Sequence, residues 1–341
     1  MWRRNIEAMP REELTKLQEE KAKRQLKYVY DYTKFFRKKF QEAGVKPEDF
    51  KSLSDIRKFP LTTKEDMKKD VTPEDPFGGR CAVPWDKVWG VHNQPEPEVD
   101  DPPILGVTTE YDREVLVDHL TRHLLMGGFA RGDIVELQAS QWEGIAFLVE
   151  GHFRMRRTVQ SLMPFTSIPI ESTLFLLDAP RATYLTKFFK PDVIITTVDY
   201  AKLMTQELEK EKGDPKKEFQ PKIVIHRFRP GSPLLDEKTR EEFKKTWGGT
   251  HLSMIDIQYA NFYAMECHQC NGHHAWEDGF IVETVDQQTG EPTAPGEKGV
   301  LTLTNLWAEG TPVIRYVTGH TAKLDTNPCN CGRTHIRIFL E

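Results

Sequence analysis

Residues 181–226 read RATYLTKFFKPDVIITTVDYAKLMTQELEKEKGDPKKEFQPKIVIH, and this segment carries the clearest signal of the fold class. Amphipathic segments at 181–189 and 201–211 alternate with short, mostly apolar runs at 193–197 and 222–226. The pattern predicts helix, strand, helix and strand in turn. Strands joined by helical crossovers pair in parallel, so we expect a parallel sheet flanked by helices.

The same alternation extends toward the N-terminus. We expect helices at 113–126 and 143–155 and strands at 133–139 and 174–177. Before them, the spacing of Leu and aromatic residues over 11–43 predicts two helices that end near Gly44. Residues 61–66, LTTKED, predict another helix, with a hydroxyl N-cap followed by acids in its first turn.

After Gly249 the sequence becomes rich in β-strand patterns, with strands expected at 280–285 and 299–306. We therefore predict an α/β protein in three parts. These are a helical N-terminal subdomain at 1–80, an α/β core at 81–250, and a β-rich lobe at 251–341.

Composition narrows the classes of function. The chain has 341 residues, and 47 basic against 52 acidic side chains give a formal net charge of -5. A protein that binds polyanions normally has a basic excess, so we expect no nucleic-acid partner. The sequence lacks a signal-peptide pattern and any run near the ~20 apolar residues that span a bilayer, so we expect no membrane partner and a cytoplasmic location.

Five cysteines are an odd number, which argues against a closed disulfide framework. One stands alone, and the others form a CxxC and a CxC pair with two histidines beside the first. In a reducing compartment such clusters are metal ligands more often than bridges, and thiolate with imidazole suits tetrahedral zinc. Packing as small apolar groups is the alternative. The residues are Cys81, Cys267, Cys270, His273, His274, Cys329 and Cys331.

Six short motifs follow one another in an order that resembles the phenylacetate-CoA ligases, a branch of the adenylate-forming acyl-CoA ligases. They cover nearly the whole chain. The resemblance implies an N-terminal adenylation domain that binds an aromatic or acyl carboxylate, ATP with magnesium, and then CoA. The motifs are MPREEL at 9–14, FPLTTK at 59–64, WED at 276–278, TGEP at 289–292, IRYVTG at 314–319 and CNCGRT at 329–334.

One departure from the family concerns the loop that wraps the ATP phosphates. The flanks are recognisable as Val91-His92 and Gly106-Val107-Thr108, but the loop between them reads NQPEPEVDDPP at 93–103. Proline has no N–H to donate to phosphate, and a like-charge pair ~4 Å apart costs about 4 kcal/mol at surface-like screening. We therefore expect ATP with magnesium not to bind at the usual place.

Three further departures point the same way. The family's Thr-Gly-Asp, whose acid holds the ribose, is Thr318-Gly319-His320 here. No Glu stands at the expected magnesium position within residues 256–262, DIQYANF. The C-terminal ligase domain of the family is expected to be absent.

The resemblance also selects the metal ligands. The family's spacing from its first Cys to the His before Trp-Glu-Asp matches Cys267 to His274. The expected ligands are Cys267, His274, Cys329 and Cys331, with Cys270 and His273 as substitutes. Four protein ligands close a tetrahedron and favour a structural zinc, whereas the loss of one thiolate would leave a catalytic position open.

The resemblance suggests two catalytic candidates, and residue type suggests the substrate-binding candidates. His92 and His320 are the catalytic candidates, and Arg315 is a candidate for pairing with a carboxylate or phosphate. For each of these residues the alternative is a structural role, such as packing or an ion pair within the fold. Tyr259 and Phe262 are the preferred substrate-binding aromatics in a larger set that also contains Trp142, Phe147, Phe165 and Tyr263.

We therefore expect a divergent phenylacetate-CoA ligase-like protein of aromatic-compound metabolism. It would bind an aromatic or acyl carboxylate or its CoA thioester, and ATP-dependent adenylation would be lost. One alternative is a noncatalytic scaffold or regulatory subunit of a larger complex, which implies a partner subunit or a homo-oligomer. Another is a ligase large subunit whose C-terminal domain is a separate chain.

Overall fold

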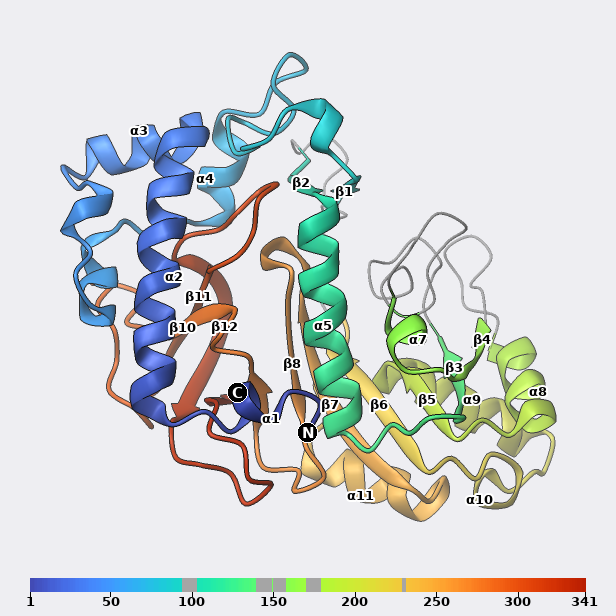
Figure 1. Ribbon diagram of the computed structural model, residues 1–341. Coiled ribbons are helices and arrows are strands. Elements are labelled where there is room, and N and C mark those ends of the chain that lie inside the picture. Colours follow the sequence, from blue (N-terminus) through green and yellow to red (C-terminus); the bar gives the residue numbers. More distant parts are fainter. Residues whose placement is uncertain (94–102, 139–148, 150–157, 170–178, 229–230) are drawn as a thin grey trace. The chain divides into compact units, whose positions relative to one another are not determined.

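The computed structural model describes residues 1–93, 103–138, 149, 158–169, 179–228 and 231–341 (Figure 1). The chain divides into two compact units, and neither is continuous in sequence. Unit 1 comprises residues 1–2, 116–256 and 263–273, and unit 2 comprises residues 3–115, 257–262 and 274–341.

Unit 1 is built on a parallel sheet. Its strands follow the order β7-β6-β5-β3-β4, all parallel to their neighbours, and β8 lies next to β7. In the sequence β4 comes between β3 and β5, although β3 and β5 are neighbours in the sheet. The connection from β3 to β4 therefore runs toward one edge of the sheet, and the connection from β5 to β6 runs toward the other. The strands are β3 (Ile134–Leu137), β4 (Thr166–Pro169), β5 (Val193–Thr196), β6 (Ile223–Phe228), β7 (Thr250–Ile257) and β8 (Phe262–Glu266).

Helices α8, α9 and α11 share a hydrophobic core with strands β5 and β6. Its large side chains include Trp247, Phe219 and Phe243, and Ile194 and Val224 come from the sheet. Strand β5 is buried over its whole length, as expected for a parallel strand with an apolar run. The helices are α5 (Glu110–Met126), which begins in unit 2, α7 (Val159–Leu162), α8 (Ala179–Phe189), α9 (Val198–Lys210), α10 (Pro215–Glu218) and α11 (Glu237–Thr246).

The predicted alternation is confirmed over the described residues. The helices expected at 113–126, 181–189 and 201–211 are α5, α8 and α9, and the strands expected at 133–139, 193–197 and 222–226 are β3, β5 and β6. The strand expected at 174–177 lies outside the described residues. Of the helix expected at 143–155, the structure describes only Val149.

Strand β4 and helix α11 are among the elements of unit 1 that were not predicted. Strand β4 has no clear apolar alternation, and helix α11 reads EKTREEFKKT with Phe243 as its one large apolar residue. The remaining signal for α11 is its N-cap. The Asp236 carboxylate accepts a hydrogen bond from the Thr239 N–H at 2.6 Å.

Unit 2 contains an antiparallel sheet. Strands β10, β11, β12 and β13 follow one another with antiparallel pairing, and β9 comes next in the order. A separate antiparallel pair joins β1 (Gly90–Asn93) to β2 (Leu105–Thr108). The strands expected at 280–285 and 299–306 are β10 (Phe280–Val285) and β11 (Gly299–Asn305); the others are β9 (His273–Ala275), β12 (Tyr316–Asp325) and β13 (Arg337–Leu340).

The N-terminal helices pack against residues from the C-terminal third of the chain (Figure 1). Leu26, Val29 and Phe40 share a buried cluster with Ile281 and Ile314. The two helices expected at 11–43 are confirmed, and Thr63 caps α4 by accepting the Asp66 N–H at 3.1 Å. The elements are α1 (Arg4–Glu7), α2 (Arg11–Tyr32), α3 (Lys34–Glu42), α4 (Lys64–Lys69) and the 3-10 helices η1 (Pro47–Asp49), η2 (Leu53–Lys58), η3 (Trp85–Lys87) and η4 (Gln258–Ala260).

No helix in the described ranges is both long and apolar enough to cross a lipid bilayer. The three-part division at residues 80 and 250 stays a prediction. Strand β7, which the sequence placed in the β-rich region, pairs in parallel with β6.

Candidate functional site

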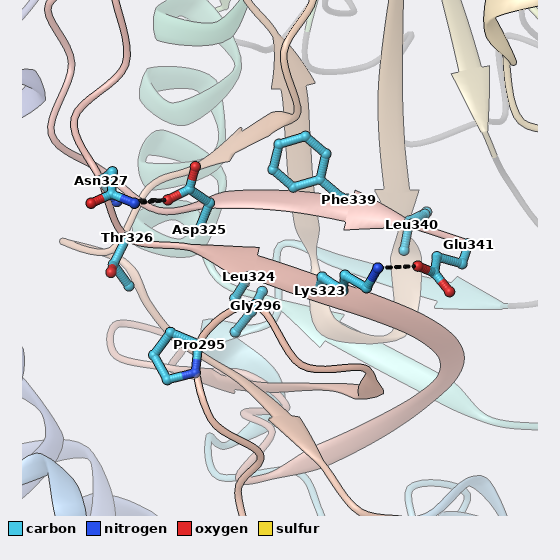
Figure 2. Close-up of a pocket in the computed structure, with 10 residues that line it drawn as sticks. All are labelled: Pro295, Gly296, Lys323, Leu324, Asp325, Thr326, Asn327, Phe339, Leu340 and Glu341. Atoms are coloured by element: carbon cyan, nitrogen blue, oxygen red, sulfur yellow. Dashed lines mark hydrogen bonds and ion pairs between the residues drawn. The ribbon is translucent and has the colours of Figure 1, made fainter.

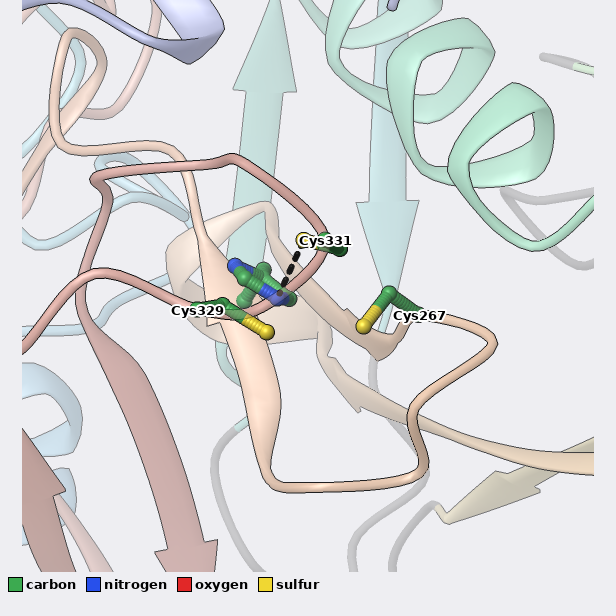
Figure 3. A group of neighbouring side chains, drawn as sticks. Cys267, Cys329 and Cys331 are labelled. Atoms are coloured by element: carbon green, nitrogen blue, oxygen red, sulfur yellow. Dashed lines mark hydrogen bonds between the residues drawn. The ribbon is translucent and has the colours of Figure 1, made fainter.

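The four preferred metal ligands lie together in the structure (Figure 3). One ligand atom from each of Cys267, His274, Cys329 and Cys331 lies within 4.8 Å of the others. Cys331 Sγ is 3.6 Å from His274 Nε2. The first three residues are buried and Cys331 is half-buried. Cys270, a predicted substitute, is not in this group.

Tight turns position the thiols. Cys267 directly follows β8, and the Cys270 N–H donates to the Cys267 carbonyl at 2.9 Å. His274 is on β9. The Gly332 N–H donates to the Cys329 carbonyl at 2.8 Å, and the positive φ of 86° at Gly332 suits glycine. Short loops thus bring side chains from distant parts of the sequence close together.

The donor set fits zinc by its chemistry. Three thiols and one imidazole are a combination that Zn²⁺ takes in closed structural sites, where all four positions belong to the protein. Soft sulfur ligands disfavour Mg²⁺ and Ca²⁺. Zinc binding itself stays a prediction.

Three of the six sequence motifs meet beside this cluster, within unit 2. Arg11 Nη1 and Nη2 donate to the two carboxylate oxygens of Glu277 at 2.6 and 2.9 Å, and Nη2 also donates to the Thr334 carbonyl at 2.7 Å. Arg333 Nη2 lies 2.7 Å from Glu7 Oε2, and both side chains are buried. These contacts fasten the loop that carries Cys329 and Cys331 to the N-terminal helices.

His92 lies on the β1–β2 hairpin. Its Nε2 is 2.9 Å from Thr108 Oγ1, and burial lowers the pKa of the imidazole. The hydrogen bond fits the packing alternative as well as a catalytic role. Nearly all of the loop expected to repel triphosphate, residues 94–102, lies outside the described residues.

His320 follows Gly319 on β12. Gly319 has a φ of 79°, and the His320 N–H donates to Thr318 Oγ1 at 3.2 Å. The imidazole is half-buried, and burial lowers its pKa. The resemblance implies a carboxylate at this position, and an imidazole offers no negative charge in its place.

Arg315 is buried and held entirely by the protein. Nε and Nη2 donate to the Glu283 carboxylate at 3.2 and 3.0 Å, and Nη2 also donates to the Gly290 carbonyl at 3.0 Å. Nη1 donates to the carbonyls of Arg57 and Phe59 at 3.2 and 2.9 Å. A guanidinium has five N–H donors, and all five have partners here. This geometry favours the ion-pair alternative over substrate binding.

Tyr259 is half-buried beside a cation that the sequence analysis missed. Lys64 Nζ lies 5.7 Å from the centre of the Tyr259 ring, and the ring of Tyr316 is 6.2 Å away. Lys64 is the first residue of α4, directly after the Thr63 cap, and it ends the FPLTTK motif, for which no site role was predicted. Phe262, in contrast, is buried and packs edge-on against Phe280 at 5.0 Å.

The other aromatic candidates are dispersed. Phe165 packs against Phe129 with ring centres 5.3 Å apart, and Tyr263 is buried on β8. Trp142 and Phe147 lie outside the described residues. These placements fit core packing for Phe165 and Tyr263.

Unit 1 buries ionisable groups that the sequence analysis also missed. Glu136 on β3 is buried; it accepts hydrogen bonds from Thr186 Oγ1 at 2.8 Å and from the Gln138 amide, and burial raises its pKa to about 7. His226 Nε2 lies 2.9 Å from His251 Nδ1. Burial lowers the pKa of His251 to about 4 and that of His226 well below its usual value.

Asp256, near the family's magnesium position, is paired inside the protein. Its carboxylate lies 2.9 Å from Arg227 Nη2, and both side chains are 1% exposed. A carboxylate neutralised in this way has less attraction for a cation.

A surface pocket of about 550 Å³ lies elsewhere in unit 2, between the 295–296 turn and strands β12 and β13 (Figure 2). Its charged groups pair with each other or with nearby residues: Lys323 with Glu341 at 3.0 Å, and Asp325 with Arg337. None of the predicted site residues lines it.

Comparison with solved structures identifies the class of the fold. A 2-hydroxyisobutyryl-CoA ligase in an open conformation, in complex with 2-HIB-AMP and CoA, superposes with a TM-score of 0.84 at 21% identity, over 98% of this chain and 75% of that chain. The same enzyme in its thioesterification state gives 0.86, over 98% and 69%. The chain therefore has the fold of the adenylate-forming CoA ligases.

Sequence comparison identifies the family. No protein-family profile matches the sequence. The chain is 31% identical to a phenylacetate-coenzyme A ligase of Thermus thermophilus, over 99% of this chain and 72% of the relative. It is 30% identical to the enzyme of that name from Escherichia coli, over 94% and 69%. The chain belongs to the phenylacetate-CoA ligase family, which confirms the resemblance found in the motifs.

Proposed function

We propose that this chain binds an aromatic or acyl carboxylate, or its CoA thioester, and that it does not form an adenylate by the mechanism of its family. The observation that carries the first part is the pairing of Lys64 with Tyr259. A half-buried ammonium 5.7 Å from a half-buried tyrosine ring places a cation, which attracts carboxylates, beside an aromatic side chain.

The proposed loss of adenylation rests on the charges of the side chains at the expected nucleotide site. Adenylation by the family uses acids at the ribose and magnesium positions. In this chain His320 stands at the first, and no Glu stands at the second. Asp256 is already paired with Arg227 at 2.9 Å. The prolines and carboxylates in residues 93–103 also oppose a phosphate cradle.

Calorimetric titration with phenylacetate tests the binding proposal. We expect heat of binding for the wild-type chain and at least about tenfold weaker binding for Lys64→Ala, since a charge-assisted hydrogen bond contributes about 1.5–3 kcal/mol. Arg181→Ala is the matched control, because Arg181 lies 5.7 Å from the centre of the Tyr184 ring in unit 1, whereas Lys64 and Tyr259 belong to unit 2. Equal affinity for phenylacetate in Lys64→Ala and wild type would show that Lys64 does not take part in binding.

Titration with ATP and magnesium tests the loss of adenylation. We expect no binding heat at millimolar nucleotide and no acyl-AMP after incubation with phenylacetate. Acyl-AMP made by the chain alone would refute the proposal. Acyl-AMP made only with a copurifying chain would support the alternative of a separate C-terminal domain.

We also propose that Cys267, His274, Cys329 and Cys331 hold a structural zinc ion. Bound zinc would keep the thiols as thiolates and hold the 267–274 and 329–331 segments together. The support is the group of four ligand atoms within 4.8 Å. Metal analysis of the purified chain and of Cys267→Ser tests it, with loss of the metal expected in the variant.

A further inference from the structure

Cys270 is the thiol that the four-residue metal group leaves out. It follows Cys267 by three residues and is half-buried, while Cys267 is buried. A closed tetrahedral site has no use for a fifth protein ligand. The position of Cys270 beside a ligand therefore needs another explanation.

The backbone brings these two cysteines into the range of a disulfide. They are the first and last residues of a turn that is closed by the Cys270 N–H and the Cys267 carbonyl at 2.9 Å. The Cα atoms at the ends of such a turn lie within about 7 Å, and disulfides span Cα distances of about 4.4–6.8 Å. The Cys270 thiol contacts the His251 carbonyl at 4.0 Å, so forming the bond requires this side chain to leave that contact.

We propose that Cys267 and Cys270 form a redox-sensitive thiol pair, which a peroxide converts to a disulfide and which thereby withdraws a ligand from the metal site. The metal release rests on the zinc proposed above. The thiol pair itself lies within unit 1 and is testable without metal.

The chemistry proceeds in two balanced steps. Hydrogen peroxide oxidises the Cys267 thiolate to a sulfenic acid and leaves as hydroxide. The Cys270 sulfur then attacks the sulfenic sulfur, the S–S bond forms, and water departs with the thiol proton. One thiolate, one thiol and one peroxide thus give one disulfide, one water and one hydroxide.

Oxidation would leave three ligands in place. Cys331 Sγ and His274 Nε2 are 3.6 Å apart, and Cys329 belongs to the same group. Three ligands hold zinc less tightly than four, so the ion becomes available to a chelator. Reduction of the disulfide restores the fourth ligand.

The test follows zinc and thiols together in the zinc-loaded full chain. Hydrogen peroxide is added with a chelating dye present, and peptides are mapped by mass spectrometry after alkylation. We expect one zinc released for each Cys267–Cys270 disulfide, and rebinding after dithiothreitol. Cys270→Ser should hold its zinc before oxidation but lose the reversible release. Cys81→Ser, at the other half-buried thiol outside the cluster, should behave like wild type.

Two results would overturn the inference. One is zinc loss while Cys270 stays reduced, and the other is a Cys270→Ser variant that lacks zinc before any oxidant is added. If wild type binds no zinc, the metal proposal fails by itself. Peptide mapping of the peroxide-treated, metal-free chain then shows whether Cys267 and Cys270 form a disulfide. Absence of this disulfide overturns the proposed thiol pair as well.

Discussion

At the scale of single residues, Glu136 is the most unusual group described. Its carboxyl group lies in the interior of unit 1 and is hydrogen-bonded to the neutral side chains of Thr186 and Gln138. No cation contacts it among the described residues. An ionised carboxylate there has no countercharge, which is why burial raises its pKa to about 7.

We predict that Glu136→Gln removes one contribution to the pH dependence of stability. The folded chain holds this proton up to about pH 7, whereas the unfolded chain releases it near 4.5. The folded state therefore binds more protons between these values, and the free energy of unfolding falls as pH rises through them. The loss is on the order of 3 kcal/mol, at about 1.4 kcal/mol for each pKa unit.

Urea unfolding between pH 5 and 8 checks this prediction. The histidine pair provides an internal control, because both imidazoles have lowered pKa values and so reduce stability as pH falls below 6.5. That contribution should persist in Glu136→Gln and, without the opposing Glu136 proton, make stability rise more steeply between about pH 5 and 6.5, while the fall toward pH 7 disappears. Parallel curves for the two proteins would contradict a proton held by Glu136.

At the scale of elements, helix α11 depends on its cap and on one buried ion pair. Asp236 caps its N-terminus, and Arg240 in its second turn forms two hydrogen bonds of 2.8 Å with the Glu266 carboxylate on β8. The helix has only Phe243 as a large apolar anchor. Polar contacts therefore fix its place on unit 1.

We predict that Asp236→Ala lowers the free energy of unfolding by about 1 kcal/mol, within the 0.5–2 kcal/mol typical of lost N-caps. Asp236→Asn is the matched control, since asparagine caps about as well. Chemical denaturation of the three proteins measures the difference. Equal losses in Ala and Asn would assign the effect to charge instead of capping.

We predict that Arg240→Met destabilises the chain by about 3–5 kcal/mol, because it leaves Glu266 buried without a countercharge. The double variant Arg240→Met with Glu266→Gln should recover much of this loss. Arg24 and Glu20 provide the surface comparison, with side chains 68% and 70% exposed. Arg24→Met should change stability by less than about 1 kcal/mol. A double variant no more stable than Arg240→Met would argue against a charge-burial cost.

At the scale of the whole molecule, we predict that a strong chelator lowers the thermal unfolding midpoint of the zinc-loaded chain. The shift should be roughly 10 °C, if zinc is present well above its dissociation constant. Cys329→Ser should start at the lower midpoint and not respond to the chelator. Cys81→Ser should respond as wild type does, and a midpoint unaffected by chelation would exclude a structural metal.

Sequence patterns predicted the parallel sheet because β5 and β6 are apolar runs bounded by amphipathic helices. They predicted the cysteine cluster because its members form short pairs. They missed α11, whose stability comes from a cap and an ion pair, and they missed Lys64. No local sequence pattern predicts the contact between Lys64 and Tyr259, because that contact arises from long-range packing of α4 near β12. Arg315 was a ligand candidate with an ion pair as the alternative, and its donors are satisfied within the fold, which favours the ion pair.

The discontinuous arrangement of unit 2 has a consequence for synthesis. Gln18 on α2 donates to the Phe280 carbonyl across 262 residues of sequence. At about 5–20 residues per second, a ribosome takes roughly 13 to 50 s to supply that partner. During this interval the apolar face of α2 and α3 has emerged without its strands. We therefore expect the nascent chain to bind a chaperone. Slowing translation before residue 280 should increase aggregation and should not increase the yield of folded protein.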